Sequence, residues 1–161
     1  MVLQLAGRLA DRGDVPLGDH CPIDRALHAL ANRPAILLLR EVFYGVSRFD
    51  PLVKRVGVTE AVAAQRLREL VAIGVLAKRP YREPGQRTRH EYVLTDRGRE
   101  LSPIVLGLLS WGETHLPDDR GSVAMTHAGC DAAVRISLHC EAGHELREDE
   151  VVVTGNTAEG G

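Results

Sequence analysis

The sequence predicts a mostly α-helical domain with one β-hairpin, followed by a small β-rich segment at the C-terminus. Three observations predict this fold class. Apolar residues recur at helical spacing through residues 22–70, two β-like runs flank a Pro-Gly turn at Pro84, and only short β-like runs follow residue 117. With 161 residues, 44% of them apolar, the chain is long enough to bury the core of one such domain.

Successive helices are expected in the first half of the chain. Pro22 and Pro34 suit first helical positions, and Ser47 and Thr59 are candidate N-caps. A glycine stands after each of the later helices and favours its end. The predicted helices span residues 22–31, 34–44, 48–56 and 60–70.

The pattern then changes from helical to β-like spacing. Residues 75–82 and 89–94 predict two strands joined by a turn at residues 83–88. Thr95 is expected to cap one further helix that continues to about Leu116. Beyond it we expect a linker at residues 117–121 and β-like runs at residues 133–138 and 151–153.

This order of elements is typical of a winged helix-turn-helix, in which the helix at residues 60–70 would be the recognition helix. One narrow sector of that helix is apolar and should face the core. On the opposite side, Gln65 can pair with an adenine edge, and Arg68 can pair with a guanine edge or a phosphate. The residues of the core-facing sector are Ala63, Leu67 and Leu70.

The predicted DNA-contacting side chains come from the recognition helix and the hairpin. Small residues on the outer face of the helix would let it approach the bases, and arginines around the hairpin tip would reach phosphates or a minor groove. An ordinary solvent-exposed polar face is the alternative interpretation of the same residues. The predicted set is Thr59, Ala61, Ala64, Gln65, Arg68, Arg82, Arg87 and Arg89.

The net charge of −2 conceals an uneven distribution along the chain. Residues 33–99 hold 14 basic and 7 acidic side chains, whereas residues 113–161 hold 3 basic and 10 acidic ones. A basic domain of this kind is a candidate for binding nucleic acid, although the near-neutral net charge of the whole chain would argue against a polyanionic partner. The sequence therefore predicts a basic DNA-binding middle and an acidic tail.

A set of short sequence blocks follows the same order and spacing as in one known family. The blocks are Cys21-Pro-Ile-Asp-Arg-Ala-Leu, Leu37-Leu-Leu-Arg-Glu, Arg48-Phe, Gln65-Arg-Leu-Arg-Glu-Leu70, Gly74-Val-Leu, Tyr92-Val-Leu-Thr-Asp-Arg-Gly-Arg-Glu-Leu101 and Trp111-Gly. In them the chain resembles the HxlR-type branch of the MarR-like transcriptional regulators, over about residues 20–115.

The resemblance implies a homodimeric, double-stranded-DNA-binding regulator from a bacterium or archaeon. It implies three parts: an N-terminal extension at residues 1–20, a winged-helix DNA-binding and dimerisation domain at 21–116, and an acidic β-like appendage at 117–161. In such proteins the terminal helices make the dimer. The dimer candidates are therefore Leu101, Ile104, Val105, Leu108 and Trp111.

Cys21 is a candidate redox sensor. Several HxlR-type regulators resemble one another in having a cysteine just before their first helix, and this cysteine senses oxidants or electrophiles. The positive end of a helix dipole favours an anion such as a thiolate at this place, and a protonated His20 would add to the effect. The alternative is a partly buried cysteine with no sensing role.

The tail contains two histidine–cysteine pairs that suggest a small zinc hairpin. A degenerate ribbon that binds no metal is equally compatible with this spacing. A third interpretation is an acidic β-appendage that packs on the dimer or binds an effector. The domain itself is expected to require no cofactor. The metal candidates are His127, Cys130, Cys140 and His144.

Other function classes find little support in the sequence. Its three cysteines are too few for a disulfide scaffold, no apolar run is long enough for a membrane span, and no signal peptide is recognisable. No catalytic triad or phosphate-binding GxxxxGK loop is present, so we expect the protein not to be an enzyme. We expect a cytoplasmic regulator, with a small-molecule effector as a candidate partner. The alternatives are a winged-helix protein-interaction module and a zinc or ligand sensor that uses the C-terminal appendage.

Overall fold

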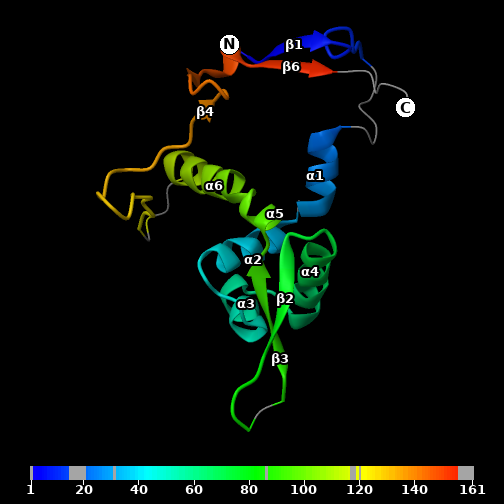
Figure 1. Cartoon of the computed structure of the whole chain (residues 1–161), viewed down its shortest axis with the longest axis vertical. Helices are drawn as coiled ribbons and strands as arrows, with labels where there is room; N and C mark the ends of the chain where they lie inside the picture. The colour runs from blue at the N-terminus through cyan, green and yellow to red at the C-terminus, as the bar shows by residue number, and fades with distance from the viewer. Residues whose placement is uncertain are drawn as a thin grey trace. The chain divides into compact units, whose positions relative to one another are not determined.

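The computed structural model describes residues 2–14, 21–30, 32–85, 87–116, 119 and 121–155 (Figure 1). The chain divides into two compact units, residues 19–122 and residues 1–18 with 123–161. The larger unit carries the helices and one hairpin. Its elements are α1 (Pro22–Leu30), α2 (Arg33–Phe43), α3 (Phe49–Val56), α4 (Glu60–Ala72), β2 (Leu76–Tyr81), β3 (Arg89–Leu94), α5 (Asp96–Arg99) and α6 (Ser102–His115).

The helix ends follow from local chemistry. The Asn32 side chain caps α2 by accepting a hydrogen bond from the Ala35 amide at 2.8 Å. Thr59 caps α4 as predicted, because its Oγ1 accepts from the Val62 amide at 3.3 Å. Gly57 ends α3 in the left-handed conformation at φ +69°, which glycine adopts without a steric penalty. These caps separate α2, α3 and α4 into distinct helices.

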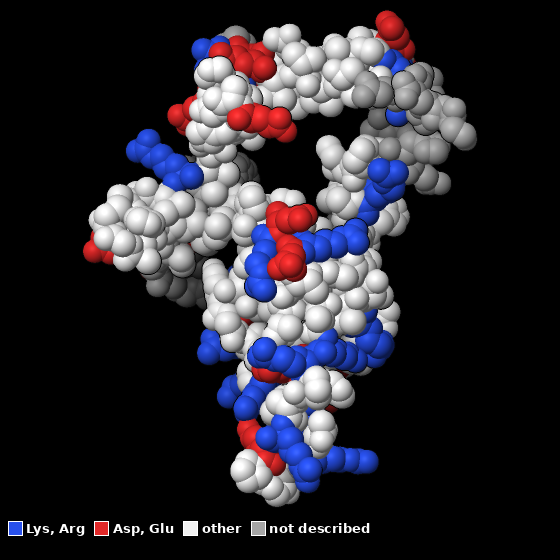
Figure 2. Space-filling model, viewed as in Figure 1, with Lys and Arg blue, Asp and Glu red and all other residues white. Residues whose placement is uncertain are grey.

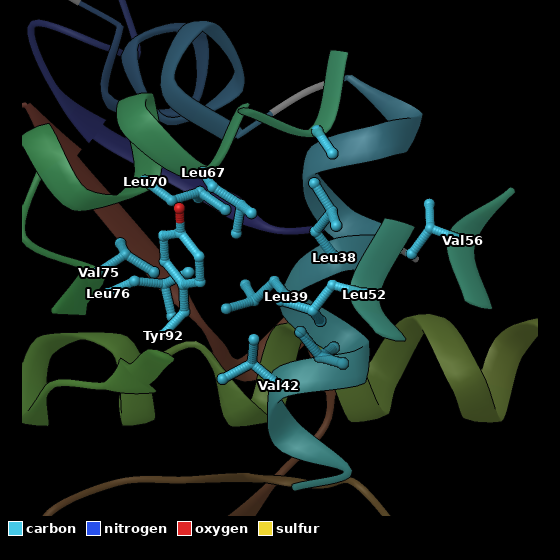
Figure 3. Close-up of a cluster of buried hydrophobic side chains, with 12 residues drawn as sticks. Leu38, Leu39, Val42, Leu52, Val56, Leu67, Leu70, Val75, Leu76 and Tyr92 are labelled. Atoms are coloured by element: carbon cyan, nitrogen blue, oxygen red, sulfur yellow. The ribbon is translucent and has the colours of Figure 1, made fainter. Parts of the chain in front are cut away.

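One apolar core holds the larger unit together (Figure 3). The sector of α4 predicted to face inward does so, since none of its side chains is more than 1% exposed. Each fully buried leucine contributes on the order of 1.5–3 kcal/mol to stability. The core side chains are Leu38, Leu39, Val42, Leu52, Val56, Ala63, Leu67, Leu70, Val75, Leu76, Tyr92 and Val105.

The hairpin of β2 and β3 is antiparallel, with a register that runs from Leu76 opposite Leu94 to Tyr81 opposite Arg89. We call this hairpin and its connecting loop, residues 76–94, the wing. The segment before α3 pairs with β3, because the Tyr92 amide donates to the Ser47 carbonyl at 2.7 Å. This pairing attaches the wing to the helices.

Ser47 is not the N-cap of α3, so that prediction was wrong. Arg48 occupies the cap position, and no side chain caps the helix there. The Ser47 hydroxyl instead donates to the Glu91 carboxylate at 2.9 Å. Pairing with β3 extends the Ser47 segment and directs its hydroxyl toward the strand, which local sequence signals do not reveal.

The single helix predicted after Thr95 is two helices, which corrects that prediction. Thr95 caps only α5, where its Oγ1 accepts from the Gly98 amide at 3.0 Å. The helix ends at Arg99, and α6 starts anew with Pro103 in its first turn. Proline lacks an amide hydrogen and its ring crowds the preceding turn, so a helix can begin but not continue through it.

The smaller unit pairs the two ends of the chain. Strand β1 (Gln4–Gly7) is parallel to β6 (Val152–Gly155), and β4 (Leu138–His139) is antiparallel to β5 (Glu145–Leu146). Residues 148–150 form a short 3₁₀ helix. The sequence did not predict that the N-terminal residues would pair with the tail.

Two β-like runs of the tail are placed differently from the prediction. Of the expected run at residues 133–138, only Leu138 lies in a strand, β4, and Ala133 forms an isolated bridge with Thr126. The expected run at 151–153 falls largely within β6. The predicted linker at 117–121 lies mostly outside the described residues.

The predicted fold class is confirmed. The larger unit is a winged helix-turn-helix, and the C-terminal segment is a small β-rich appendage. None of the helices in the described part of the chain combines the length and the apolar character that a membrane span requires.

Candidate nucleic-acid interface

The outer face of α4, opposite its apolar sector, is exposed as the sequence predicts. Ala61, Gln65 and Arg68 are exposed, and Ala64 is half-buried beside them. The small alanine side chains leave the helix surface flat between the polar ones. This face has the shape and the donor and acceptor groups needed to approach base edges in a major groove.

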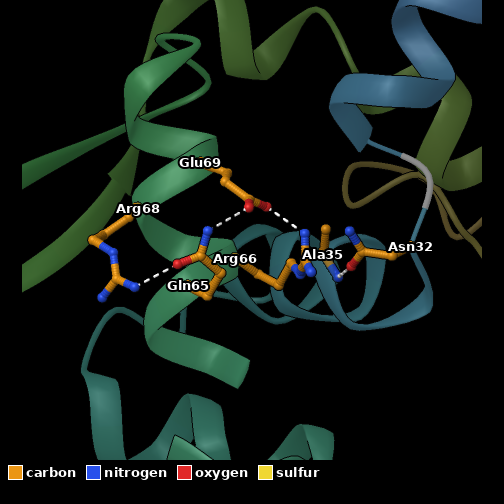
Figure 4. Close-up of polar contacts among 6 residues, drawn as sticks. All are labelled: Asn32, Ala35, Gln65, Arg66, Arg68 and Glu69. Atoms are coloured by element: carbon orange, nitrogen blue, oxygen red, sulfur yellow. Dashed lines mark hydrogen bonds and ion pairs between the residues drawn. The ribbon is translucent and has the colours of Figure 1, made fainter. Parts of the chain in front are cut away.

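A hydrogen-bonded chain joins the polar side chains of this face (Figure 4). Gln65 Nε2 donates to Glu69 Oε1 at 2.7 Å, and Arg68 Nη2 donates to Gln65 Oε1. The second Glu69 oxygen accepts from Arg66 Nη1 at 2.6 Å. The spacings of three and four residues place these side chains next to one another on a helix.

The hydrogen-bonded chain favours the ionised form of the Glu69 carboxyl. The hydrogen bond from Gln65 lowers the pKa of its carboxyl below the ordinary value, and Arg66 lowers it further, although partial burial acts in the opposite direction. A carboxylate at this position accepts hydrogen bonds and donates none. No site role was predicted for Glu69, although its spacing of four residues from Gln65 indicates the contact.

The wing carries the predicted arginines as exposed side chains. Arg82 and Arg87 lie in the loop between the strands, and Arg89 is the first residue of β3. Arg89 lies 4.0 Å from the Asp50 carboxylate of α3, so it is less free to reach a phosphate than its position alone indicates. The wing thus places guanidinium groups on two sides of its tip.

The sequence did not indicate a role for two further cations that contact the wing. Arg79 lies opposite Glu91 in the strand register, and its Nε donates to Glu91 Oε1 at 2.7 Å. Arg48 pairs with Glu83 at 2.8 Å and lies 4.7 Å from the centre of the Tyr81 ring. The alternation of residues in the two strands could have indicated the Arg79–Glu91 pair.

Glu91 links the wing to the segment before α3. Its carboxylate accepts from Arg79 and from the Ser47 hydroxyl, and these hydrogen bonds lower its pKa, against a smaller opposing effect of burial. Its side chain is 17% exposed. The ionised form of Glu91 therefore contributes to the attachment of the wing.

Lysine and arginine side chains gather over the larger unit and along its wing, as Figure 2 shows on the face in view. Acidic side chains are interspersed among them on the same face. The local excess of positive charge agrees with the charge pattern along the sequence. Such a surface attracts the phosphates of a nucleic acid at long range.

Cys21 directly precedes α1, and its carbonyl accepts from the Arg25 amide at 3.0 Å, as expected for a residue at a helix start. Its side chain is partly exposed, and its sulfur is a free thiol. The neighbouring His20, predicted to assist it, lies outside the described residues.

The apolar residues of α6 do not share one environment. Val105 is only 7% exposed and belongs to the core, and Leu101 packs against that core. Ile104, Leu108 and Trp111 are each more than half exposed. Of the five predicted dimer candidates, only these three therefore lie on the exposed side of α6. Helix α1 also presents exposed apolar side chains, at Ile23 and Leu27.

The metal candidates lie in two separate pairs. His127 Nδ1 is 3.1 Å from Cys130 Sγ, and Cys140 Sγ is 3.4 Å from His144 Nδ1. Within the described ranges, no three or more His, Cys, Asp or Glu side chains come together in a group that could hold a metal ion. The structure therefore forms both sequence-predicted pairs but does not assemble them into the four-ligand set.

Comparisons with known proteins agree with the fold. Residues 29–120 match the HxlR-like helix-turn-helix family. A helix-turn-helix-type transcriptional regulator of Mycobacterium tuberculosis, described as uncharacterized, is 35% identical over 126 residues, which make up 77% of this chain and 78% of that protein.

Solved structures extend the similarity. PA1607, described as a candidate transcription factor, has a TM-score of 0.70 and 29% identity over 81% of this chain and 91% of its own. The redox regulator HypR in its reduced form has a TM-score of 0.55 and 28% identity, over 60% of this chain and 95% of its own. The fold, the exposed face of α4 and these matches together show that the chain belongs to the HxlR-like helix-turn-helix family of transcriptional regulators, which are not enzymes.

Proposed function

We propose that this protein is a homodimer that binds specific sequences of double-stranded DNA and regulates transcription in the cytoplasm. The observation that carries the proposal is the exposed face of α4, where Gln65 and Arg68 stand beside small alanines. Residues 21–116 would form the DNA-binding and dimerisation domain, and the binding requires no cofactor. Base edges would be read by α4, and phosphates would be contacted by the wing.

Dimerisation would follow from the exposed apolar side chains of α6. Ile104, Leu108 and Trp111 lie about one helical turn apart, and a large apolar strip of this kind is favoured to be buried against a partner. A two-fold axis would present two α4 helices to two half-sites. Because the half-sites have a fixed spacing, a small change at the interface would weaken contacts at both.

Regulation by oxidation is a second proposal, supported by the placement of Cys21. The thiol is free, partly exposed and at the start of α1. HypR, one of the similar solved structures, is itself called a redox regulator. Reaction of the Cys21 thiol with an external oxidant or electrophile would alter the separation of the two recognition helices and release the DNA.

Selection from a randomised double-stranded DNA library tests the proposed function. We expect the full chain to enrich one inverted-repeat sequence, and to bind it with an affinity that falls steeply as salt concentration rises. A protein-interaction module would enrich no sequence. Enrichment of nothing by a folded, dimeric preparation would overturn the proposal, and a sequence without two half-sites would overturn the homodimer.

A further inference from the structure

We propose that Glu69 is a positioning residue that fixes the orientation of the Gln65 amide and thereby sets the base that Gln65 reads. This inference rests on the proposed DNA binding and concerns which residues of α4 determine specificity. Its observation is the chain of contacts from Glu69 through Gln65 to Arg68 on the exposed side of the helix (Figure 4).

The two ends of this chain are chemically opposite. The Glu69 carboxylate only accepts hydrogen bonds, whereas the Arg68 guanidinium only donates them. The Gln65 amide has a donor nitrogen and an acceptor oxygen, and either could face either neighbour if the amide rotated by half a turn. With Glu69 on one side and Arg68 on the other, only one orientation satisfies both contacts.

A fixed amide still has groups left for DNA. Gln65 Nε2 uses one of its two hydrogens on Glu69, and Oε1 uses one of its two lone pairs on Arg68. One donor and one acceptor remain, in a set order along the helix. An adenine edge presents an acceptor and a donor side by side. The remaining donor and acceptor of a fixed Gln65 amide can therefore pair with adenine in one orientation of the base. A freely rotating amide would also donate to guanine or accept from cytosine.

Glu69 is itself held in place. Arg66 Nη1 donates to its second oxygen at 2.6 Å, and the two side chains are 33% and 37% exposed. Both carboxylate oxygens therefore have partners, and the carboxylate cannot turn away without losing one of them. Because Arg66 occupies Oε2 of Glu69, Oε1 of Glu69 is left to accept from Gln65. Arg66 therefore helps to hold the Glu69 carboxylate in place.

The experiment compares the base preference of variants of the full-length protein, using the randomised double-stranded DNA library as probe. Gln65→Ala first identifies the base pair that Gln65 reads, as the position at which preference is lost. Glu69→Gln keeps the volume but replaces the carboxylate by an amide that can itself rotate. We expect it to reduce discrimination at that one position about ten-fold, within the range for one bidentate base contact.

Matched variants separate orientation from charge and from folding. Glu60→Gln removes the same charge from the first turn of α4 and should strengthen binding to all sequences without changing the preference. Glu69→Asp keeps a carboxylate at a spacing that pairs with glutamine on helices, so it should retain more discrimination than Glu69→Gln. In the Gln65→Ala background, Glu69→Gln should have no further effect at that position.

The outcomes distinguish this inference from the proposed function. If the wild-type chain enriches no sequence, the proposed function fails. If it enriches a sequence, and Glu69→Gln and Glu69→Ala both leave the preference at the Gln65 position unchanged, the positioning role is wrong. A sharper preference in Glu69→Gln would also overturn it, because Glu69 would then compete with the base for Gln65. Thermal unfolding of each variant shows that it remains folded.

Discussion

Gly98 of α5 lies directly against the Val75 carbonyl at the start of the wing. A Cβ atom added at Gly98 would lie 2.1 Å from that oxygen, far inside any allowed contact. The Thr95 hydroxyl donates to the same carbonyl at 3.2 Å and to that of Gly74 at 2.6 Å. The close approach of α5 to the backbone before β2 therefore depends on the absence of a side chain at Gly98.

Gly98→Ala should destabilise the protein by at least about 2 kcal/mol, because backbone must move to relieve the clash. The measurement is the free energy of unfolding in denaturant at a fixed protein concentration. Gly107→Ala in α6 is the control, since apart from its chain neighbours and the backbone of its own helix no atom of the structure lies within 4 Å of the added Cβ. A Gly98→Ala protein as stable as the control would contradict this packing.

Arg68→Ala and Arg87→Ala should weaken DNA binding in different ways. If Arg68 reaches a base edge, its loss costs about 1–3 kcal/mol on the preferred sequence and relaxes the preference at one position. Loss of a phosphate contact at Arg87 should weaken binding to all sequences alike and lower the salt slope by about one. Titrations of specific and scrambled duplexes over a range of salt concentrations measure both effects. Equal affinity of Arg68→Ala for the preferred sequence would show that the recognition face is wrong.

Leu108→Glu should convert the dimer into a monomer. It introduces a charge into the proposed contact strip of α6, and burying that charge without a partner costs about 3 kcal/mol or more. Analytical ultracentrifugation measures the association constant. Val123→Glu is the control, because Val123 is 53% exposed and Leu108 54%, but Val123 lies in the other unit. A Leu108→Glu protein that remains dimeric would exclude this side of α6 as the interface.

Treatment with diamide or a quinone should release the wild-type protein from its preferred DNA. Cys21→Ser should stay bound under the same treatment, whereas Cys130→Ser and Cys140→Ser should respond like the wild type. Fluorescence anisotropy of a labelled duplex follows the release. An oxidant response that survives in Cys21→Ser would remove Cys21 from the mechanism.

The attachment of the wing should depend on pH through Glu91. Because hydrogen bonds from Arg79 and Ser47 lower the pKa of its carboxyl in the folded protein, the ionised form stabilises the fold. That contribution is complete above the pKa of the carboxyl in the unfolded chain, about 4.3, and is lost as the pH falls through the lower pKa of the folded protein. Wild type should therefore exceed Glu91→Gln in stability at neutral pH, and the difference should shrink below about pH 4.

Unfolding curves at several pH values measure this difference, with Glu100→Gln as an exposed control. A stability difference between wild type and Glu91→Gln that is constant from neutral to acidic pH would show that the carboxylate charge is not what holds the wing.

The sequence by itself determined the order of the helices and strands over residues 22–94 and the two faces of α4. Periodicity and capping are local properties, so Thr59, the inward leucines and the outward Gln65 and Arg68 could be placed without knowledge of the fold. The two strand spans of the hairpin and the charge excess of the middle region were likewise readable, because alternation and composition need no long-range contact.

Only the tertiary structure decided which groups meet across long separations. Ser47 pairs with β3 instead of capping α3, Val105 is buried in the core while its neighbours on α6 are exposed, and β1 joins the far end of the chain at β6. Each of these depends on contacts between segments distant in sequence, whose free energy exceeds the local preferences of the residues involved. The contact of Glu69 with Gln65 is the intermediate case: spacing permits it, and the geometry of the side chains decides it.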